Sequence, residues 1–378
     1  MSDREPVIVA ARRSPIATRG RGLAGLTVEH LAAPVLRATL QDARRTMGGS
    51  HAVADVILGN CMGPGGNPAR VTALAAGLDA SVPGMTLDRQ CGSGLAAILN
   101  AATAIRAGDA RLRLAGGVES ASTAPVRSID GRSYDRAPFA PAGFADPDMT
   151  RAAEDLASAM GISRIRQDAA ALRSRARAFA AGNRGVFDAE LVPLGALSRD
   201  EAASVVSPAT IARFAPLFPS GTLTAGNSCR ISDGAALVAV APSSLDRGGA
   251  AGLAVISHAT VGCDPLLPGL GAALAIRTAL EHADLTVTSI SAFEIVEAFA
   301  AQLLAVLDVL GIDDDDPRVS SDGGALAFGH PWGASGAVSV VRLFSRLVRG
   351  GTPLGSLGVA AASVGGGMGV AAIFEVVR

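Results

Sequence analysis

The chain has 378 residues, 49% of them hydrophobic and 18% charged, so it is long enough for two or three core-sized units and too apolar for bulk disorder. Its net charge of −1 argues against nucleic acid as a main partner, and the absence of lysine excludes a Schiff-base mechanism. The first residues show no secretory pattern and no apolar run approaches the ~20 residues of a membrane span. We therefore expect a cytoplasmic protein with no membrane segment.

Strands and helices alternate in the first third of the chain. The runs VIVAA (7–11), ADVILGN (54–60) and RLRLAGGVES (111–120) predict strands, and the segments 26–44 and 94–109 predict helices. This alternation is typical of an α/β layered domain.

Residues 120–221 interrupt the pattern and are richer in Pro, Arg and Ser. Helical segments are expected at 151–159 and 163–182. The second carries five arginines that we interpret as a solvated helix face, with a docking surface for a phosphorylated ligand as the alternative: Arg164, Arg166, Arg173, Arg175 and Arg177. The acidic run DDDDP (313–317) is interpreted as a solvated loop.

Regular alternation of strands and helices returns after residue 222, and a weak internal repeat relates this part to the first part of the chain. RAGDARLRLAGGVES (106–120) is similar to VRGGTPLGSLGVAAASVGGG (348–367), and a helix opened by a polar, glycine-rich turn precedes each, at 91–94 and at 330–336. Two similar halves would place these two helix starts on matching sides of the molecule.

One of the four cysteines stands in a setting that favours chemistry. Cys61, Cys91, Cys229 and Cys263 are widely spaced, so we expect reduced thiols and neither disulfide nor metal. Cys91, in LDRQCGSGL, is expected at a helix N-terminus, where free N–H groups favour the thiolate. The small residues at 92–94 leave room for a substrate.

Two further glycine-rich turns supply candidate partners for this cysteine. His330, in GGALAFGHPWGASG (323–336), is the natural acceptor for its proton. In SVGGGMG (363–369), three consecutive glycines let backbone N–H groups approach a ligand closely and form an oxyanion hole.

The chain resembles the thiolase family of CoA-dependent enzymes over essentially its full length. The matching stretches, in order, are DRQCGSGLAAI (88–98), AGGVESAS (115–122), GTLTAGNSCRISDGAA (221–236), EAFAAQ (297–302), GGALAFGHPWGASG (323–336) and GGGMG (365–369). The resemblance implies a thiolase fold with duplicated αβαβα layered halves and a homodimer or homotetramer. It assigns 1–119 and 222–265 to an N-terminal half, 120–221 to an inserted loop domain and 266–378 to a C-terminal half.

The resemblance also implies roles for individual residues. Cys91 matches the acylated nucleophile, His330 matches the histidine that activates it, and Gly365 matches the glycine whose N–H stabilises the thioester oxyanion together with that of Cys91. Positions near the pantetheine and acyl pocket are matched by Met149, Ala225 and Phe299. A coenzyme A thioester enters as substrate, and no permanently bound cofactor is implied.

Several positions depart from the family pattern. Ser363 stands where the family has a second cysteine that removes and returns the substrate's α-proton, and a serine hydroxyl needs a base to do this. Val296 replaces an asparagine that holds a water in a second oxyanion hole. Smaller departures near the CoA chain and the pocket are Cys229, Arg230, Pro268 and Asp148.

Three functions follow from this divided pattern. The first is a thiolase-type acyltransferase that forms S-acyl-Cys91 from an acyl-CoA. The second uses only the Cys–His half-reaction and passes the acyl group from CoA or a carrier protein to another acceptor, or condenses it decarboxylatively as ketosynthases do. The third is a degenerate, non-catalytic binding subunit, which an unreactive Cys91 would favour.

Overall fold

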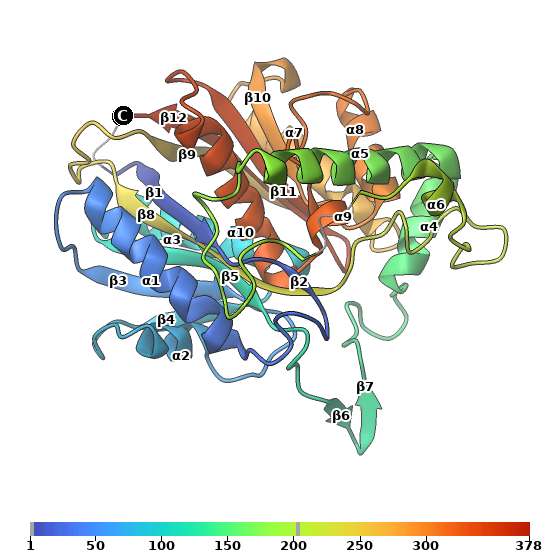
Figure 1. Ribbon diagram of the computed structural model, residues 1–378, viewed down its shortest axis with the longest axis horizontal. Coiled ribbons are helices and arrows are strands. Elements are labelled where there is room, and N and C mark those ends of the chain that lie inside the picture. Colours follow the sequence, from blue (N-terminus) through green and yellow to red (C-terminus); the bar gives the residue numbers. More distant parts are fainter. Residues whose placement is uncertain (1–3, 202–204) are drawn as a thin grey trace.

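The computed structural model describes residues 4–201 and 205–378, and these contain one main sheet of ten strands (Figure 1). Its strand order is β10-β11-β12-β9-β1-β8-β5-β3-β4, and β2 pairs with β8 beside this path. The N-terminal part supplies β1 (Pro6–Arg13), β2 (Ala17–Thr18), β3 (Val53–Gly59), β4 (Gly84–Leu87), β5 (Leu112–Glu119) and β8 (Ser232–Pro242), with helices α1 (Val28–Thr46), α2 (Pro68–Ala75) and α3 (Ser93–Arg106) and the turn η1 (Gln90–Gly92).

The C-terminal part repeats this plan. It supplies β9 (Gly252–Gly262), β10 (Ile290–Ile295), β11 (Leu357–Val364) and β12 (Met368–Val377), with α7 (Gly271–Glu281), α8 (Ala300–Leu310), α9 (Ala325–Phe328) and α10 (Trp332–Leu343). Short helical turns complete it: η2 (Pro268–Leu270), η3 (Val287–Ser289) and η4 (Phe344–Arg349). The strands and helices expected in the first third of the chain are all present, with ends shifted by a few residues.

Helices α3 and α10 form the middle layer between the two strand groups. Their side chains share one buried cluster with inward-facing residues of β3, β5 and β8 on one side and of β10, β11 and β12 on the other. The helix α3 is apolar on most of its surface, and its exposed residues Asn100 and Thr103 lie on one narrow face. A Cβ at Gly94 would meet the Ala337 nitrogen at 2.8 Å, so the glycine permits the close approach of the two helices.

Four other helices cover the outer faces of the sheet. Helices α1 and α2 pack with the N-terminal strands, and α7 and α8 pack with the C-terminal strands. Side chains of β11 alternate between the middle and the outer cluster, as the period of two in a strand requires. The predicted αβαβα order is thus confirmed across the molecule, and the two helix starts at 91–94 and 330–336 lie together at its centre.

The strand β9 connects the two strand groups. It pairs with β12 over ten residues and with β1 at only two, Val7 and Ile8. Most of its hydrogen bonds are therefore with the C-terminal strands, although residues up to 265 were grouped with the N-terminal half. The division of the chain into domains stays a prediction.

In its described residues, the inserted region between β5 and β8 contains a hairpin and three helices. They are β6 (Arg127–Ile129), β7 (Arg132–Tyr134), α4 (Met149–Ala159), α5 (Arg164–Asn183) and α6 (Pro208–Ala212). The β6–β7 hairpin stands away from the layered body, whereas α5 lies across the C-terminal part (Figure 1).

The interpretation of the α5 arginines as a solvated face is wrong. None of the five is fully exposed, and Arg175 is 6% exposed. Arg166 forms ion pairs with Asp308 and Asp314, which also ties the acidic 313–317 loop to the helix. Arg177 donates to the Val319 carbonyl at 2.6 Å. The charge pattern is the same for a solvated face and for a docked one, and only the packing of α5 decides between them.

Among residues 4–201 and 205–378, no helix is long and apolar enough to cross a membrane. Within the same ranges, no three His, Cys, Asp or Glu side chains are grouped so that they could hold a metal ion.

Candidate active site

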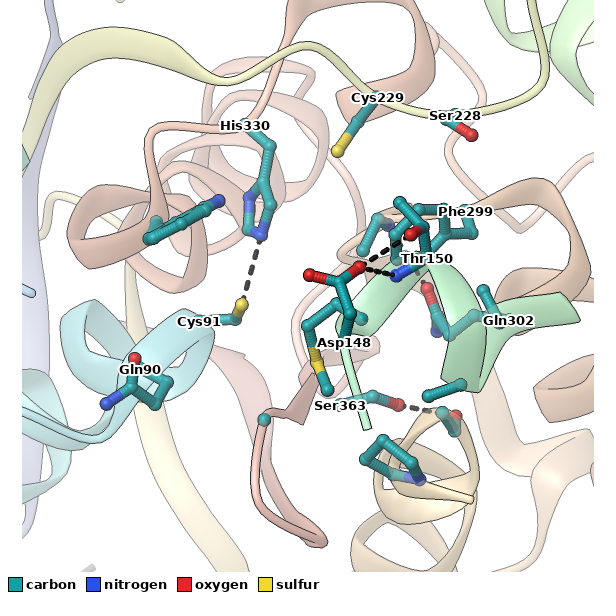
Figure 2. A pocket seen from close by; sticks show the side chains of 18 of the residues that line it. Gln90, Cys91, Asp148, Thr150, Ser228, Cys229, Phe299, Gln302, His330 and Ser363 are labelled. Carbon is teal, nitrogen blue, oxygen red and sulfur yellow. Dashed lines mark hydrogen bonds between the residues drawn. The ribbon is translucent and has the colours of Figure 1, made fainter. Parts of the chain in front are cut away.

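A pocket of about 450 Å³ opens where the two halves and the inserted region meet (Figure 2). Side chains from η1, α4, the 217–231 segment, η2, the start of α8 and the β11–β12 turn line it. Seven of the nine predicted site residues are among them: Cys91, Met149, Cys229, Phe299, His330, Ser363 and Gly365.

Cys91 lies in a tight turn just before α3. The preceding residue, Gln90, has a φ of 45°, a strained value for a residue with a side chain. The Ser93 hydroxyl accepts from the Arg89 N–H and donates to the Gln90 carbonyl, both at 2.7 Å. These two bonds stabilise the turn that presents the Cys91 thiol to the pocket.

The small residues after Cys91 serve packing rather than the substrate. A Cβ at Gly92 would lie 2.7 Å from a Val370 methyl, and Gly94 abuts α10. Neither Gly92 nor Ser93 lines the pocket. The expectation that residues 92–94 make room for a substrate is therefore wrong, because helix and strand neighbours fill that space.

His330 stands directly beside the cysteine. Its Nε2 lies 3.1 Å from the Cys91 sulfur, and its Nδ1 lies 2.6 Å from the Ser335 hydroxyl oxygen (Figure 2 shows the first contact). The Ser335 hydroxyl in turn donates to the Pro331 carbonyl at 3.1 Å, so it accepts a proton from Nδ1. This hydrogen-bond pattern assigns the proton of the neutral ring to Nδ1 and leaves the Nε2 lone pair facing the thiol.

Burial keeps this pair uncharged in the free protein. It raises the pKa of the Cys91 thiol to about 12, against the opposing effect of the backbone N–H groups of Cys91 and Gly365. Burial likewise lowers the pKa of His330 to about 4. Desolvation thus outweighs the helix N-terminus, and the expectation that the resting Cys91 favours the thiolate is wrong.

Gly365 brings a second backbone donor to the cysteine. Its N–H and the N–H of Cys91 both lower the pKa of the Cys91 thiol, so the two donors face the same sulfur atom. Phe139 of the inserted region covers this turn, since a Cβ at Gly365 would lie 2.6 Å from its ring. The two N–H groups have the arrangement expected of an oxyanion hole, and that role stays a prediction.

The Ser363 hydroxyl is committed to the backbone. It donates to the Gly269 carbonyl at 2.7 Å and accepts from the Ala272 N–H at 3.0 Å. In Figure 2 its oxygen points away from Cys91. The hydroxyl therefore links β11 to the start of α7, and neither of its two partners can accept a proton and act as a base.

Two predicted pocket residues do not line the pocket. Val296 is 4% exposed, belongs to the cluster around α3 and α10, and donates its N–H to the Ala361 carbonyl. Ala225 is exposed at the surface. The backbone ahead of α8 turns the 296 side chain into the core, and the 224–227 turn directs Ala225 outward. Neither residue therefore lines this cavity, and their contact with substrate stays a prediction.

The other predicted residues lie as expected around the pocket. Met149 begins α4, and Phe299 immediately precedes α8. The Cys229 side chain points into the same space in Figure 2, and burial together with the nearby Cys91 raises the pKa of its thiol. Asp148 and Pro268, noted as departures, also line the pocket.

Sequence reasoning missed three residues that support the site. Ser335 orients His330, Gln302 lines the pocket, and the buried Glu119 accepts from the Gly333 N–H at the start of α10 and from the Cys61 N–H. Each lies in a stretch that carries the family resemblance: Glu119 in AGGVESAS, Gln302 in EAFAAQ and Ser335 in GGALAFGHPWGASG. The residue types alone did not indicate what each side chain contacts.

The chain belongs to the thiolase family. The family's N-terminal domain matches residues 6–244, and its C-terminal domain matches residues 251–376. The protein is accordingly a thiolase-superfamily acyltransferase, an enzyme class that transfers acyl groups from thioesters.

Individual relatives match nearly the whole chain. The protein named "Putative acetyl-CoA C-acetyltransferase YhfS" from Bacillus subtilis strain 168 is 42% identical, with 98% of this chain and 99% of the relative covered. "Putative acetyl-CoA C-acetyltransferase VraB" from Staphylococcus haemolyticus is 39% identical, with 98% and 99% covered. The crystal structure of the Bacillus anthracis acetyl-CoA acetyltransferase superimposes with a TM-score of 0.89 at 35% identity and covers 99% of both chains.

Proposed function

We propose that this acyltransferase takes its acyl group from a coenzyme A thioester and carries it on Cys91. The observation that carries the proposal is the 3.1 Å contact between Cys91 and the unprotonated Nε2 of His330, whose Nδ1 proton is held by Ser335. The acetyl-CoA in the names of the relatives supports CoA as the carrier. Coenzyme A acts here as substrate, and no resident cofactor is proposed.

The chemistry of this half-reaction follows from the geometry. As the Cys91 sulfur attacks the thioester carbonyl, its proton passes to His330 Nε2, and the N–H groups of Cys91 and Gly365 stabilise the oxyanion. The carbon–sulfur bond to CoA then breaks, and the imidazolium protonates the departing CoA thiolate. A neutral resting pair suits this sequence, since His330 begins as a free base.

Intact-protein mass after brief exposure to acetyl-CoA tests the proposal. We expect an added acetyl group in the wild type, none in Cys91→Ala, and slow addition in His330→Asn. A Cys263→Ala variant, which changes a cysteine outside the pocket, serves as the matched control and should still acquire the group. Folded wild-type protein that acquires no acyl group from acetyl-CoA or longer acyl-CoAs would contradict the proposal and favour a carrier-protein donor or a binding subunit.

A second candidate is favoured by the Ser363 hydrogen bonds. With that hydroxyl committed to Gly269 and Ala272, a decarboxylative condensation, or transfer to an amine or alcohol, needs no base at position 363. Carbon dioxide release from malonyl-CoA by the acylated enzyme, without any reaction of a second acetyl-CoA, would identify this candidate.

We further infer a cytoplasmic homodimer or homotetramer. The free thiols of Cys61, Cys91, Cys229 and Cys263 support a reducing compartment. The projecting β6–β7 hairpin, in which Ile129 is 61% exposed, and the adjoining Val126, 87% exposed, support association with another copy. Light scattering coupled to size-exclusion chromatography tests the assembly, and a monomeric mass at micromolar concentration would refute it.

A further inference from the structure

Transfer of the acyl group to carbon requires a base, and the position expected to supply it does not. Ser363 is bonded to Gly269 and Ala272, and Val296 is packed in the core. The pocket must therefore hold another group if the acceptor is a second acyl thioester. This inference rests on the proposed function and concerns its second half-reaction.

Asp148 presents an ionisable oxygen to the same pocket. It caps α4, and its Oδ1 accepts from the Thr150 N–H at 2.9 Å and from the Thr150 hydroxyl at 2.5 Å. Both of these bonds are made by one oxygen, so they fix the carboxylate without occupying the other. In Figure 2 that second oxygen points to the side of the pocket where Cys91 and His330 stand.

Other titratable groups that line the described pocket are less suited to accept an α-proton. Arg136 is paired with Asp146 and stacked on Phe139, and the pKa of Cys229 is raised by burial. The Nε2 atom of His330 is already the proton acceptor for the Cys91 thiol. Among the described lining residues the carboxylates are Asp135 and Asp148, and Asp135 lies in the loop after β7 rather than on a capped helix.

Gln302 lines the same pocket and carries a buried donor without a partner in the described part of the chain. Its side-chain oxygen accepts from the Ala298 N–H at 3.1 Å, whereas its Nε2 has no hydrogen-bond partner among the described residues. The residue is only 3% exposed, so this unmet donor is costly unless a ligand satisfies it. It can provide the hydrogen bond that a valine at position 296 cannot.

We propose that Asp148 is the base that removes the α-proton of a second acyl thioester, whose enolate oxygen accepts from Gln302. The α-carbon then attacks the carbonyl of S-acyl-Cys91, so a carbon–carbon bond forms and the bond to the Cys91 sulfur breaks. The Cys91 thiolate takes up a proton from solvent through His330 Nε2, and the exposed Asp148 releases the α-proton to solvent, so the step neither consumes nor produces a net proton. The product is a 3-oxoacyl thioester.

Deuterium uptake into the methyl group of acetyl-CoA in D₂O measures the proposed step directly. We expect wild-type enzyme to catalyse uptake, and Asp148→Asn to lose ~10²-fold or more of it, as removal of a general base does. Asparagine also caps helices, so α4 should persist. Asp155→Asn, on the same helix but outside the pocket, is the matched control and should keep wild-type uptake. Gln302→Leu should lower uptake by ~10²-fold.

Acylation of Cys91, followed by protein mass, separates this inference from the proposed function. Asp148→Asn should acquire the acetyl group at the wild-type rate, which shows that the variant is folded and that only the second half-reaction is lost. If Asp148→Asn takes up deuterium at the wild-type rate, the inference is overturned. The same holds if Ser363→Ala loses deuterium uptake while Asp148→Asn keeps it. Acylated wild-type enzyme that exchanges no α-protons also overturns it and favours the decarboxylative candidate.

Discussion

The Nε2 atom of His330 lies 3.1 Å from the sulfur of Cys91, although 239 positions separate the two residues in the chain. Each residue stands where a helix of the middle layer begins, Cys91 before α3 and His330 before α10. Because these helices pack against each other, their starting turns meet. The proposed reactive pair is thus a consequence of the contact between the two halves.

Ser335 should act as a positioning residue for His330. Replacing it with alanine removes the acceptor of the Nδ1 proton, so the ring is free to rotate and to change tautomer. We expect the acylation rate to fall about tenfold, the cost of about one hydrogen bond, with little change in the Michaelis constant for acetyl-CoA. Ser339→Ala, on the same helix, is the control. Equal effects of both substitutions would assign Ser335 a structural role only.

The rate at which Cys91 is alkylated should depend on pH as expected for a neutral thiol. Since burial raises its pKa to about 12, alkylation by iodoacetamide should increase about tenfold per pH unit between about pH 7 and about pH 10. The C91A variant corrects for the other cysteines. Acylation should stay constant from about pH 6 to about pH 9, because His330, with its pKa lowered to about 4, remains neutral. An alkylation plateau near neutral pH would instead indicate a thiolate–imidazolium pair.

Glu119 should contribute to the stability of the turn beneath the site. Its carboxylate accepts from the side chain of Asn60 and from the N–H groups of Cys61, Met62 and Gly333, at 2.9–3.1 Å. In Glu119→Gln, an NH₂ group replaces one accepting oxygen and faces N–H donors. We expect a loss of about 1–3 kcal/mol in the free energy of unfolding, measured by urea denaturation.

The matched control for this substitution is Glu201→Gln. Glu201 also accepts from two backbone N–H groups, those of Thr18 and Gly22, but at the exposed surface. Water can replace those bonds, so we expect a change within about 0.5 kcal/mol. Similar losses at the two positions would contradict the idea that burial makes Glu119 important.

The buried Glu190 should be the most sensitive ion-pair position in the chain's interior. It lies between Arg13, at 2.7 Å, and Arg342, at 2.5 Å, and all three side chains are at most 2% exposed. Glu190→Gln removes the charge shared by the two guanidinium groups. Arg13 keeps its pair with Asp200, and Arg342 keeps its pair with Asp322, so we expect a loss of about 1–3 kcal/mol in unfolding free energy. Asp155→Asn, which breaks the exposed pair with Arg151, should cost less than about 1 kcal/mol.

The same group should make the protein sensitive to acid. Burial alone would raise the pKa of Glu190, but Arg342 and Arg13 outweigh it, and the folded-state pKa is lowered. A carboxyl with a lowered pKa stabilises the fold above its unfolded pKa of about 4.3 and loses that contribution as the pH falls further. The acid unfolding of Glu190→Gln should therefore be less steep than that of the wild type. Identical slopes would refute this.

Much of the layered fold could be predicted from local patterns. Strands such as β5 and β8 are largely apolar, and α3 is apolar on most of its surface, so their type and burial follow mainly from their own residues. The arginines of α5 show the limit of this reasoning. Their spacing fits a solvated face, yet Arg175 is buried and Arg166 is paired with Asp314, because the helix docks on a distant part of the chain.

The sequence by itself determined the alternation of strands and helices, the helix starts that carry Cys91 and His330, and the glycine-rich turn at Gly365. The strands and helices follow from short-range hydrophobic periodicity. The turns follow from glycine, because few other residues adopt the conformations that these turns need. Only the tertiary structure decided that Ser363 is bonded to the backbone, that Val296 faces the core and that Asp148 faces the pocket. Those outcomes depend on which distant segments pack beside a residue, because burial and neighbouring donors set both the orientation of a side chain and its protonation.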